Sequence, residues 1–240
     1  MRVVALDTTT RAGSVALIED GRVVDDRSGD GARTHALRLP GEVVTVVDAS
    51  GAPMSAIDVY AVATGPGSFT GLRIGIATIQ GLAFVHGRRI VGVPVLEALA
   101  HAVSADLPDG AVIAAWMDAH RQDVFSALYR VRDGQAFSRE RLVEIEEPMV
   151  GAPAAVLTRW AAMSVTPAVF AGDGAEMFVA EIANAFPSAR VQTLPLLAGV
   201  IGQLATARIS EGMDPAAVRP FYVRRPDVEI TRDEKLRQRS

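Results

Sequence analysis

Short apolar runs alternate with amphipathic segments along the chain, and their order predicts a mixed α/β protein. An apolar run at 2–7, an alternating run at 13–20 and a run at 21–26 behind an Asp20-Gly21 turn predict a three-stranded antiparallel meander. After it we expect a helix at about 34–48, a strand at 59–64, a helix at about 70–86, a strand at 89–93 and a helix at 94–103.

The same pattern then returns. The run at 111–118 ends in Asp118 as the first run ends in Asp7, and a second Asp-Gly turn is expected at Asp133-Gly134. Further elements are expected as strands at 123–135, 141–147 and 168–172 and as helices at about 152–163, 175–185 and 196–211. This repeat predicts two lobes, at 1–104 and 109–221, each a mixed sheet with a three-strand antiparallel meander flanked by helices, and a charged tail at 222–240.

A duplicated α/β architecture with an Asp at the end of the first strand of each half resembles the actin-like ATPase superfamily, with its ribonuclease H-like lobes. In that superfamily an Asp-x-Gly hairpin in each half wraps the phosphates of a nucleotide. Here the triplets are Asp7-Thr8-Thr9 and Asp118-Ala119-His120, so both glycines are replaced. We therefore expect a degraded nucleotide cleft at Asp7, Thr8, Thr9 and Asp118, with weak nucleotide binding left open.

Residues 64–75, "TGPGSFTGLRIG", form a glycine-rich turn before a helix. Their spacing fits neither the P-loop nor the dinucleotide fingerprint, so we expect a strand-to-helix turn with Ser68 or Thr70 as the N-cap. On a helical wheel one stripe faces the sheet, and Gly71, Gly75, Thr78 and Leu82 form a second, flat surface. Only Arg73 is charged between Thr70 and Val85. Because a surface helix normally has a polar face, this pattern predicts that another layer or another protein covers the helix.

Composition and charge narrow the function classes. The chain is 49% hydrophobic and 22% charged with a net charge of −4, which is typical of a globular protein and gives no sign of a basic face for nucleic acid. It has no cysteine, so thiolate metal sites and a cysteine nucleophile are excluded. The N-terminal apolar run is too short for a signal peptide, and no stretch is long enough to span a membrane. We expect a cytoplasmic protein.

The sequence also lacks the residue spacings that are typical of metal sites and of nucleophilic catalysis. The four histidines have no zinc-binding spacing, and Ser68 has no identifiable base. Asp7 and Asp118 could hold a hydrated Mg²⁺, although strand-end carboxylates that cap turns are the simpler interpretation. We expect no catalytic residue, no metal site and no cofactor.

Several segments together resemble the TsaB family of bacterial tRNA threonylcarbamoyladenosine biosynthesis proteins, with the match running from residue 1 to about 224. They are "ALDTTTRAGSVAL", "HALRLPGEV", "VATGPGSFTGLRIGIATIQGLA", "LEALA", "MDAHRQDVFSALY" and "RPFYVRR". The resemblance implies an actin-like fold and a non-catalytic partner of the metal-binding subunit TsaD, which transfers threonylcarbamoyl to the adenosine beside the anticodon of tRNAs reading ANN codons. It also implies that the ATPase TsaE docks on the assembled pair and that tRNA is met only within the complex.

In that family the two helices after the first meander form the subunit contact. Carried over to this sequence, the resemblance implies a partner interface at His35, Leu39, Val43, Gly71, Arg73, Gly75, Thr78 and Leu82. It further implies that Gly75→Leu folds but does not pair. One departure is Ala36, where the family usually has Ser. An ATP-binding enzyme that uses Asp7 and Asp118, a peptidase, and a homodimer through the same helices remain as alternatives.

Overall fold

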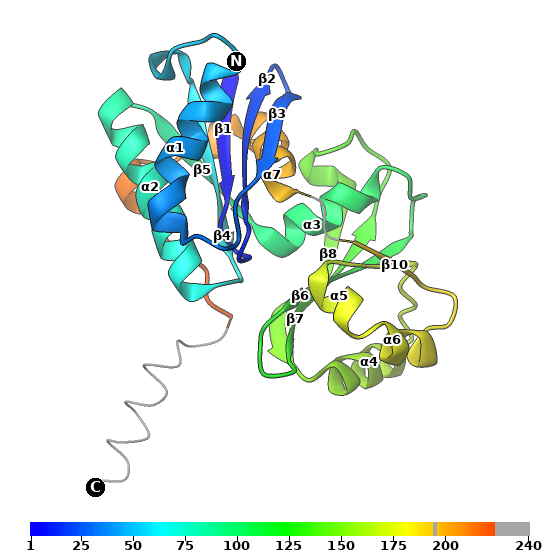
Figure 1. The fold of residues 1–240 in the computed structure, drawn as a ribbon. Helices are drawn as coiled ribbons and strands as arrows, with labels where there is room; N and C mark the ends of the chain where they lie inside the picture. Colours follow the sequence, from blue (N-terminus) through cyan, green and yellow to red (C-terminus); the bar gives the residue numbers. More distant parts are fainter. Residues whose placement is uncertain (194–195, 224–240) are drawn as a thin grey trace, which may run out of the picture.

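The computed structural model describes residues 1–193 and 196–223, which form two lobes, each built on a five-stranded sheet (Figure 1). The strand orders are β3-β2-β1-β4-β5 and β10-β9-β6-β7-β8, which are the same order with the second written in reverse. The strands are β1 (Arg2–Asp7), β2 (Ser14–Glu19), β3 (Arg22–Ser28), β4 (Val59–Gly65), β5 (Arg89–Pro94), β6 (Val112–Asp118), β7 (Val124–Val131), β8 (Leu142–Gly151), β9 (Val169–Ala171) and β10 (Arg190–Gln192). The helices are α1 (His35–Asp48), α2 (Phe69–His86), α3 (Val95–Ser104), α4 (Pro153–Ala162), α5 (Asp173–Met177), α6 (Val179–Ala185) and α7 (Leu197–Ala207).

Both faces of the first sheet are covered, which explains why β1 is apolar at successive positions. Alternate residues point to opposite faces: Val4 and Leu6 pack against α1 and α2, whereas Val3 and Ala5 join the core around α3 and α7. β1 pairs antiparallel with β2 and parallel with β4. The first meander and its Asp20-Gly21 turn are as predicted, with positive φ angles of 48° and 79° at the two turn residues.

The second sheet repeats this arrangement. Trp116 of β6 packs with Trp160 of α4 on the outer face, whereas Ile113 and Met117 point to the same core as Val3 and Ala5. Helices α3 and α7 lie between the two sheets and contribute to one continuous core, so the lobes are joined by packing as well as by the chain (Figure 1). The predicted duplicated actin-like fold is confirmed.

Four local expectations are wrong. The helix expected at 175–185 is broken at Phe178, which leaves the helical region and separates α5 from α6. β10 was not expected. The last helix ends at Ala207 rather than near 211. Asp133-Gly134 makes no tight hairpin, because β7 ends at Val131 and a long loop leads to β8 at Leu142.

The division into lobes also differs from the expected boundary at 221. Helix α7 packs on the first sheet, and the chain then runs along the first lobe, where Met213 bridges to Ile90 and the amide of Phe221 donates to the carbonyl of Thr64. The second lobe therefore ends near β10, and residues 197–223 belong to the first. Residues 224–240, most of the expected tail, lie outside the described residues. No helix of the described part is long and apolar enough to cross a membrane.

Candidate functional site

The end of β1 and the loop between β1 and β2 contain most of the predicted degraded cleft, and the first residues of the loop are buried. Asp7, Thr8 and Thr9 are 3%, 0% and 4% exposed. Oδ1 of Asp7 accepts hydrogen bonds from the backbone N–H of Thr9 at 2.9 Å and from its hydroxyl at 2.6 Å. Burial raises the pKa of the Asp7 carboxyl, and these two hydrogen bonds act against that rise. The Asp7 carboxylate therefore stabilises the conformation of the loop itself.

The glycine-rich turn packs directly against this loop. A Cβ at Gly67 would lie 2.5 Å from Cβ of Thr9, and Cβ atoms at Gly71 and Gly75 would overlap the carbonyl oxygen and the side chain of Thr8. The amide of Ser68 donates to the carbonyl of Thr9 at 2.9 Å. The glycines thus let the start of α2 approach the loop closely. Gly71 and Gly75 therefore pack inside the lobe, and their expected contact with a partner helix stays a prediction.

The corresponding loop of the second lobe, after β6, is held by different contacts. Oδ1 of Asp118 accepts the amide of His120 at 2.7 Å, and Oδ2 of Asp118 lies 3.1 Å from Nδ1 of His120. Asp173 accepts the amide of Asp118 at 3.0 Å. His120, Arg121 and Gln122 all have left-handed φ angles of 59°, 55° and 63°. Three such residues in a row store backbone strain, which often marks a functional loop.

A cavity of about 700 Å³ lies between the two loops. Thr9 and Asp118 of the predicted degraded cleft line it, whereas Asp7 and Thr8 do not. The two carboxylates that could have formed a cation pair are thus not presented together to this cavity. Among the described residues no cluster of three or more histidines and carboxylates could hold a metal ion.

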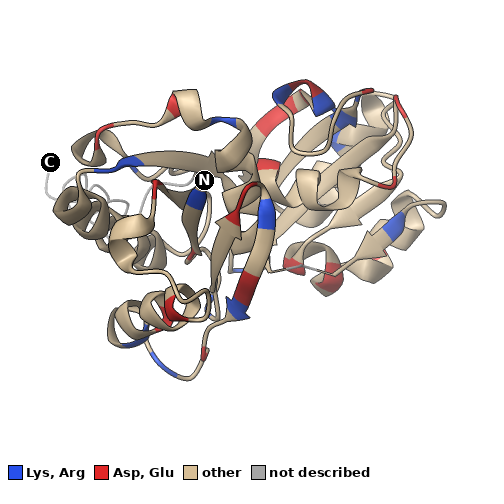
Figure 2. Ribbon diagram, turned by 90° about the horizontal axis from the view of Figure 1, so that it is seen from above, with Lys and Arg blue, Asp and Glu red and all other residues tan. Residues whose placement is uncertain are grey.

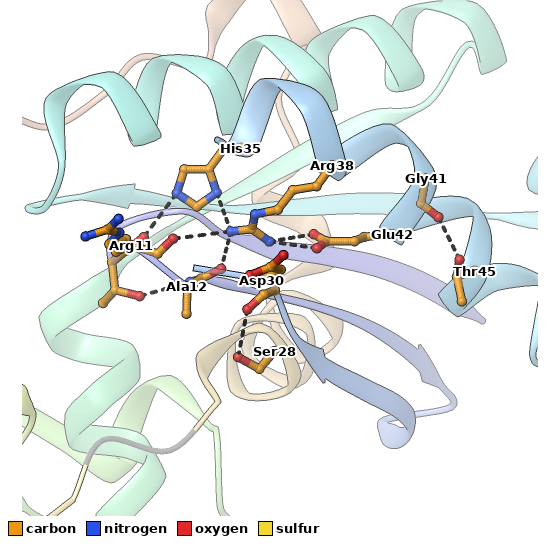
Figure 3. A network of polar contacts seen from close by, with 12 residues as sticks. Arg11, Ala12, Ser28, Asp30, His35, Arg38, Gly41, Glu42 and Thr45 are labelled. Carbon is orange, nitrogen blue, oxygen red and sulfur yellow. Dashed lines mark hydrogen bonds and ion pairs between the residues drawn. The ribbon is translucent and has the colours of Figure 1, made fainter. Parts of the chain in front are cut away.

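Helix α1 is tied to the first loop by a buried arginine (Figure 3). Arg38 is 4% exposed, and its Nη1 donates to both carboxylate oxygens of Glu42 at 2.8 and 2.7 Å. Its Nη2 donates to the carbonyls of Arg11 and Ala12 and to Nδ1 of His35, the last at 2.8 Å. A guanidinium has donors only, so His35 must accept at Nδ1 and carry its proton on Nε2.

Nε2 of His35 then donates to the carbonyl of Thr10 at 3.1 Å. Burial lowers the pKa of His35, and the charge of Arg38 lowers it further. His35 is therefore neutral and acts as a brace between α1 and the loop.

The predicted interface residues divide into two groups. In the first group, the residues are buried inside the first lobe, and their contact with a partner stays a prediction: His35, Leu39, Val43, Gly71 and Gly75. Arg73 is exposed, and Thr78 and Leu82 are partly exposed. The guanidinium of Arg73 lies 3.9 Å from the ring centre of Phe69, and its Nε donates to the hydroxyl of Tyr222 at 3.1 Å.

The apolar side chains that do reach solvent on α1 and α2 lie elsewhere. Leu37 is 70% exposed, Val44 47%, Phe84 81% and Val85 75%. Leu37 and Val44 are seven positions apart and so share a face of α1. We call these four residues the outer face of α1 and α2. The signal that could have found them was present in the sequence, because both helices carry more apolar residues than one sheet-facing stripe requires.

Known proteins resemble this chain in sequence and in structure. The family model of TsaD, tRNA N6-adenosine threonylcarbamoyltransferase, matches residues 29–233. YeaZ from Pseudomonas aeruginosa is 30% identical with a TM-score of 0.72, over 92% of this chain and 99% of that one. The chain therefore belongs to the family of the TsaD model, and within it to the TsaB/YeaZ type.

Curated relatives are consistent with this membership. The tRNA threonylcarbamoyladenosine biosynthesis protein TsaB of Escherichia coli is 34% identical over 62% of this chain, and TsaB of Haemophilus influenzae is 34% identical over 52%. The matched parts span 64% and 52% of these two relatives. A nucleotide-bound dehydratase activator from Clostridium difficile, 12% identical with a TM-score of 0.52, shares the fold alone.

Proposed function

We propose that this chain is a non-catalytic scaffold subunit required for threonylcarbamoyl transfer to the adenosine beside the anticodon of ANN-decoding tRNAs. It acts in the cytoplasm by pairing with a metal-dependent, TsaD-type transferase subunit. Two findings support the reaction: the chain's membership in the family, and the tRNA threonylcarbamoyladenosine biosynthesis named for its curated relatives.

The outer face of α1 and α2 carries the proposal. Phe84 and Val85, adjacent residues at the end of α2, are 81% and 75% exposed, and exposed apolar surface of this kind often marks a contact with another protein. Helical interfaces of standard size bury roughly 800 Å² per partner, and a few apolar or aromatic anchors supply most of the affinity. Leu37 and Val44 are the large apolar side chains exposed on α1. We assign all four side chains as anchors of the contact with the transferase subunit.

The internal contacts beneath this face support a scaffold role. Arg38 ties α1 to the loop after β1, and Gly71 and Gly75 seat α2 on Thr8 of the same loop. Both helices are thus held against one buried segment before any partner arrives. A rigid surface loses little conformational entropy on binding, which favours affinity. The buried residues implied by the family resemblance, such as Leu39, act through this support.

Three other partners belong to the proposal: a second copy of this chain, an ATPase and the tRNA. A chain without its transferase subunit can cover the outer face with a second copy of itself, which gives an isologous homodimer. A TsaE-type ATPase docks only on the assembled pair, and tRNA enters as part of the complex.

A reconstitution tests the proposal. Unmodified tRNA, threonine, bicarbonate and ATP are mixed with the synthase, the transferase subunit and the ATPase, and modified nucleoside is quantified with and without this chain. We expect product only when the chain is present. Equal product in its absence would contradict the scaffold role.

The second candidate is an ATP-binding enzyme, because Thr9 and Asp118 line the cavity between the lobes. Against it, the backbone of the first loop is already packed by Gly67 and Gly71. Calorimetric titration with Mg-ATP separates the two candidates. Micromolar binding would favour the enzyme, and binding that is weak or undetectable is expected for the scaffold.

A further inference from the structure

The cavity between the lobes combines two kinds of side chain that the scaffold role leaves unused. One wall is aromatic: Phe69 opens α2, and Phe221 and Tyr222 come from the segment that returns from the second lobe. Three other lining residues are basic: Arg11 and Arg33 from the first lobe and Arg121 from the strained loop of the second. The net charge of the chain is −4, and Figure 2 shows both signs scattered over both lobes, so these arginines form a local feature and not part of a basic face.

The aromatic wall is held in place. The rings of Phe69 and Tyr222 lie 5.1 Å apart with a tilt of 34°, and Arg73 contacts both of them. Phe221 is 44% exposed, and its amide is bonded to Thr64. This wall therefore offers a fixed apolar surface to the cavity.

The acidic residues of the cavity are engaged within the protein. Asp118 accepts the amide of His120 and lies beside its ring, and Asp173 accepts the amides of Asp118 and Gly174. Burial raises the pKa of Asp173, and the hydrogen bonds from the amides of Asp118 and Gly174 act against that rise. The lining of the cavity thus has three arginines, whose charge does not depend on pH, and two carboxylates that accept hydrogen bonds within the protein.

We propose that this cavity holds an unpaired nucleotide of the tRNA, with its base against the aromatic wall and its phosphate facing the arginines. Stacking on aromatic rings together with arginine contacts to phosphate is how proteins bind single-stranded RNA. A free nucleoside triphosphate fits less well, since Gly67 and Gly71 fill the backbone positions that would cradle its phosphates. This inference rests on the proposed function, because it assigns to this subunit a contact with the substrate of the complex.

The test measures binding of fluorescent, unmodified tRNA to the complex of this chain with the transferase subunit. We expect Tyr222→Leu to weaken binding about fivefold or more and Tyr222→Phe to restore it, because stacking needs a ring and not a hydroxyl. Arg33→Ala should weaken binding and reduce the slope of log K against log salt by about 0.7, the value for one phosphate on a single strand. Arg190→Ala is the matched control: it removes an exposed arginine that does not line the cavity, and it should change neither quantity.

Two results would overturn the inference. The first is tRNA affinity that Tyr222→Leu and Arg33→Ala leave unchanged while both variants still bind the transferase subunit. The second is micromolar binding of AMP or ATP to this chain that the same substitutions abolish while tRNA binding persists. Failure to bind the transferase subunit would instead count against the proposed function, and co-purification of each variant with that subunit separates the two failures.

Discussion

Gly75 of α2 lies directly against the side chain of Thr8, so that a Cβ at this glycine would overlap Oγ1 and lie 3.0 Å from Cγ2 of Thr8. The contact joins residues 67 positions apart in the chain and seats the helix on the buried loop after β1. Gly71 and Gly75, the first two residues of the small-residue stripe of α2, therefore pack inside the lobe.

Substitution of this glycine should therefore damage the fold. We expect Gly75→Ala to lower the midpoint of thermal unfolding of the isolated chain, because overpacking costs about 1–3 kcal/mol and exceeds the gain in helix propensity. Gly81 lies in the same helix with open space around its Cβ position, so Gly81→Ala should raise the midpoint. If the two variants moved the midpoint in the same direction, the assigned packing would be wrong.

Arg38 should be among the most sensitive charged residues of the first lobe. Removing one member of a buried ion pair typically costs about 3–5 kcal/mol, since the remaining groups lose their partners. Arg38→Met leaves Glu42, His35 and the carbonyl of Ala12 without their donor. Urea unfolding should show a loss in this range.

Arg27 provides the comparison for Arg38. It pairs with Asp25, but its side chain is 48% exposed, so Arg27→Met should change the free energy of unfolding by less than about 1 kcal/mol. A loss for Arg38→Met no larger than that for Arg27→Met would refute the bracing role of the network.

His101 makes stability depend on pH. It is 2% exposed and faces Glu97 from its own helix, Arg208 just after α7 and Arg141 before β8, and its ring lies beside that of Phe137. Burial lowers its pKa from 6.5 to about 4. The unfolded chain therefore binds a proton that the folded chain does not, and stability is lost as pH falls from about 6.5 towards 4.

The full loss corresponds to about 3 kcal/mol, since one pKa unit is worth about 1.4 kcal/mol. His101→Phe should abolish this component, so the free energy of unfolding of the variant should rise relative to that of wild type by about 3 kcal/mol as the pH falls from 7 to 4. Asp26, whose pKa is raised to about 6 by burial, titrates equally in both proteins and cancels in the difference. A difference that stayed constant from pH 7 to pH 4 would contradict the assignment.

The sequence predicts most of the fold because its strands are buried on both faces and its turns are well marked. Val3 to Leu6 read as one apolar run, and Asp20-Gly21 is a favoured hairpin turn. β10 escaped prediction because three residues at a sheet edge, Arg190–Gln192, are too few to show a periodic pattern. Phe178 ends a helix through packing in the second core, which local propensity does not record.

The site could be predicted only in part. Helical periodicity groups Gly71, Gly75, Thr78 and Leu82 on one side of α2 but does not say what lies there. The loop at Thr8 covers the first two, and the other two stay partly exposed. Likewise the return of Phe221 and Tyr222 to the first lobe is a long-range contact without a local signal. The interface that the family resemblance implies on α1 and α2 stays a prediction, and several of its residues are buried inside the first lobe.

The scaffold role depends on the outer face of α1 and α2, and one measurement tests it directly. The affinity of the transferase subunit is measured for the wild-type chain, for Phe84→Asp and for Met163→Asp, which places the same charge at a 43% exposed apolar residue of the second lobe. We predict that Phe84→Asp weakens pairing at least about tenfold, equivalent to 1.4 kcal/mol, with an unchanged unfolding midpoint, and that Met163→Asp pairs normally. Equal affinity of all three proteins would contradict the account, because the partner would then bind elsewhere or not at all.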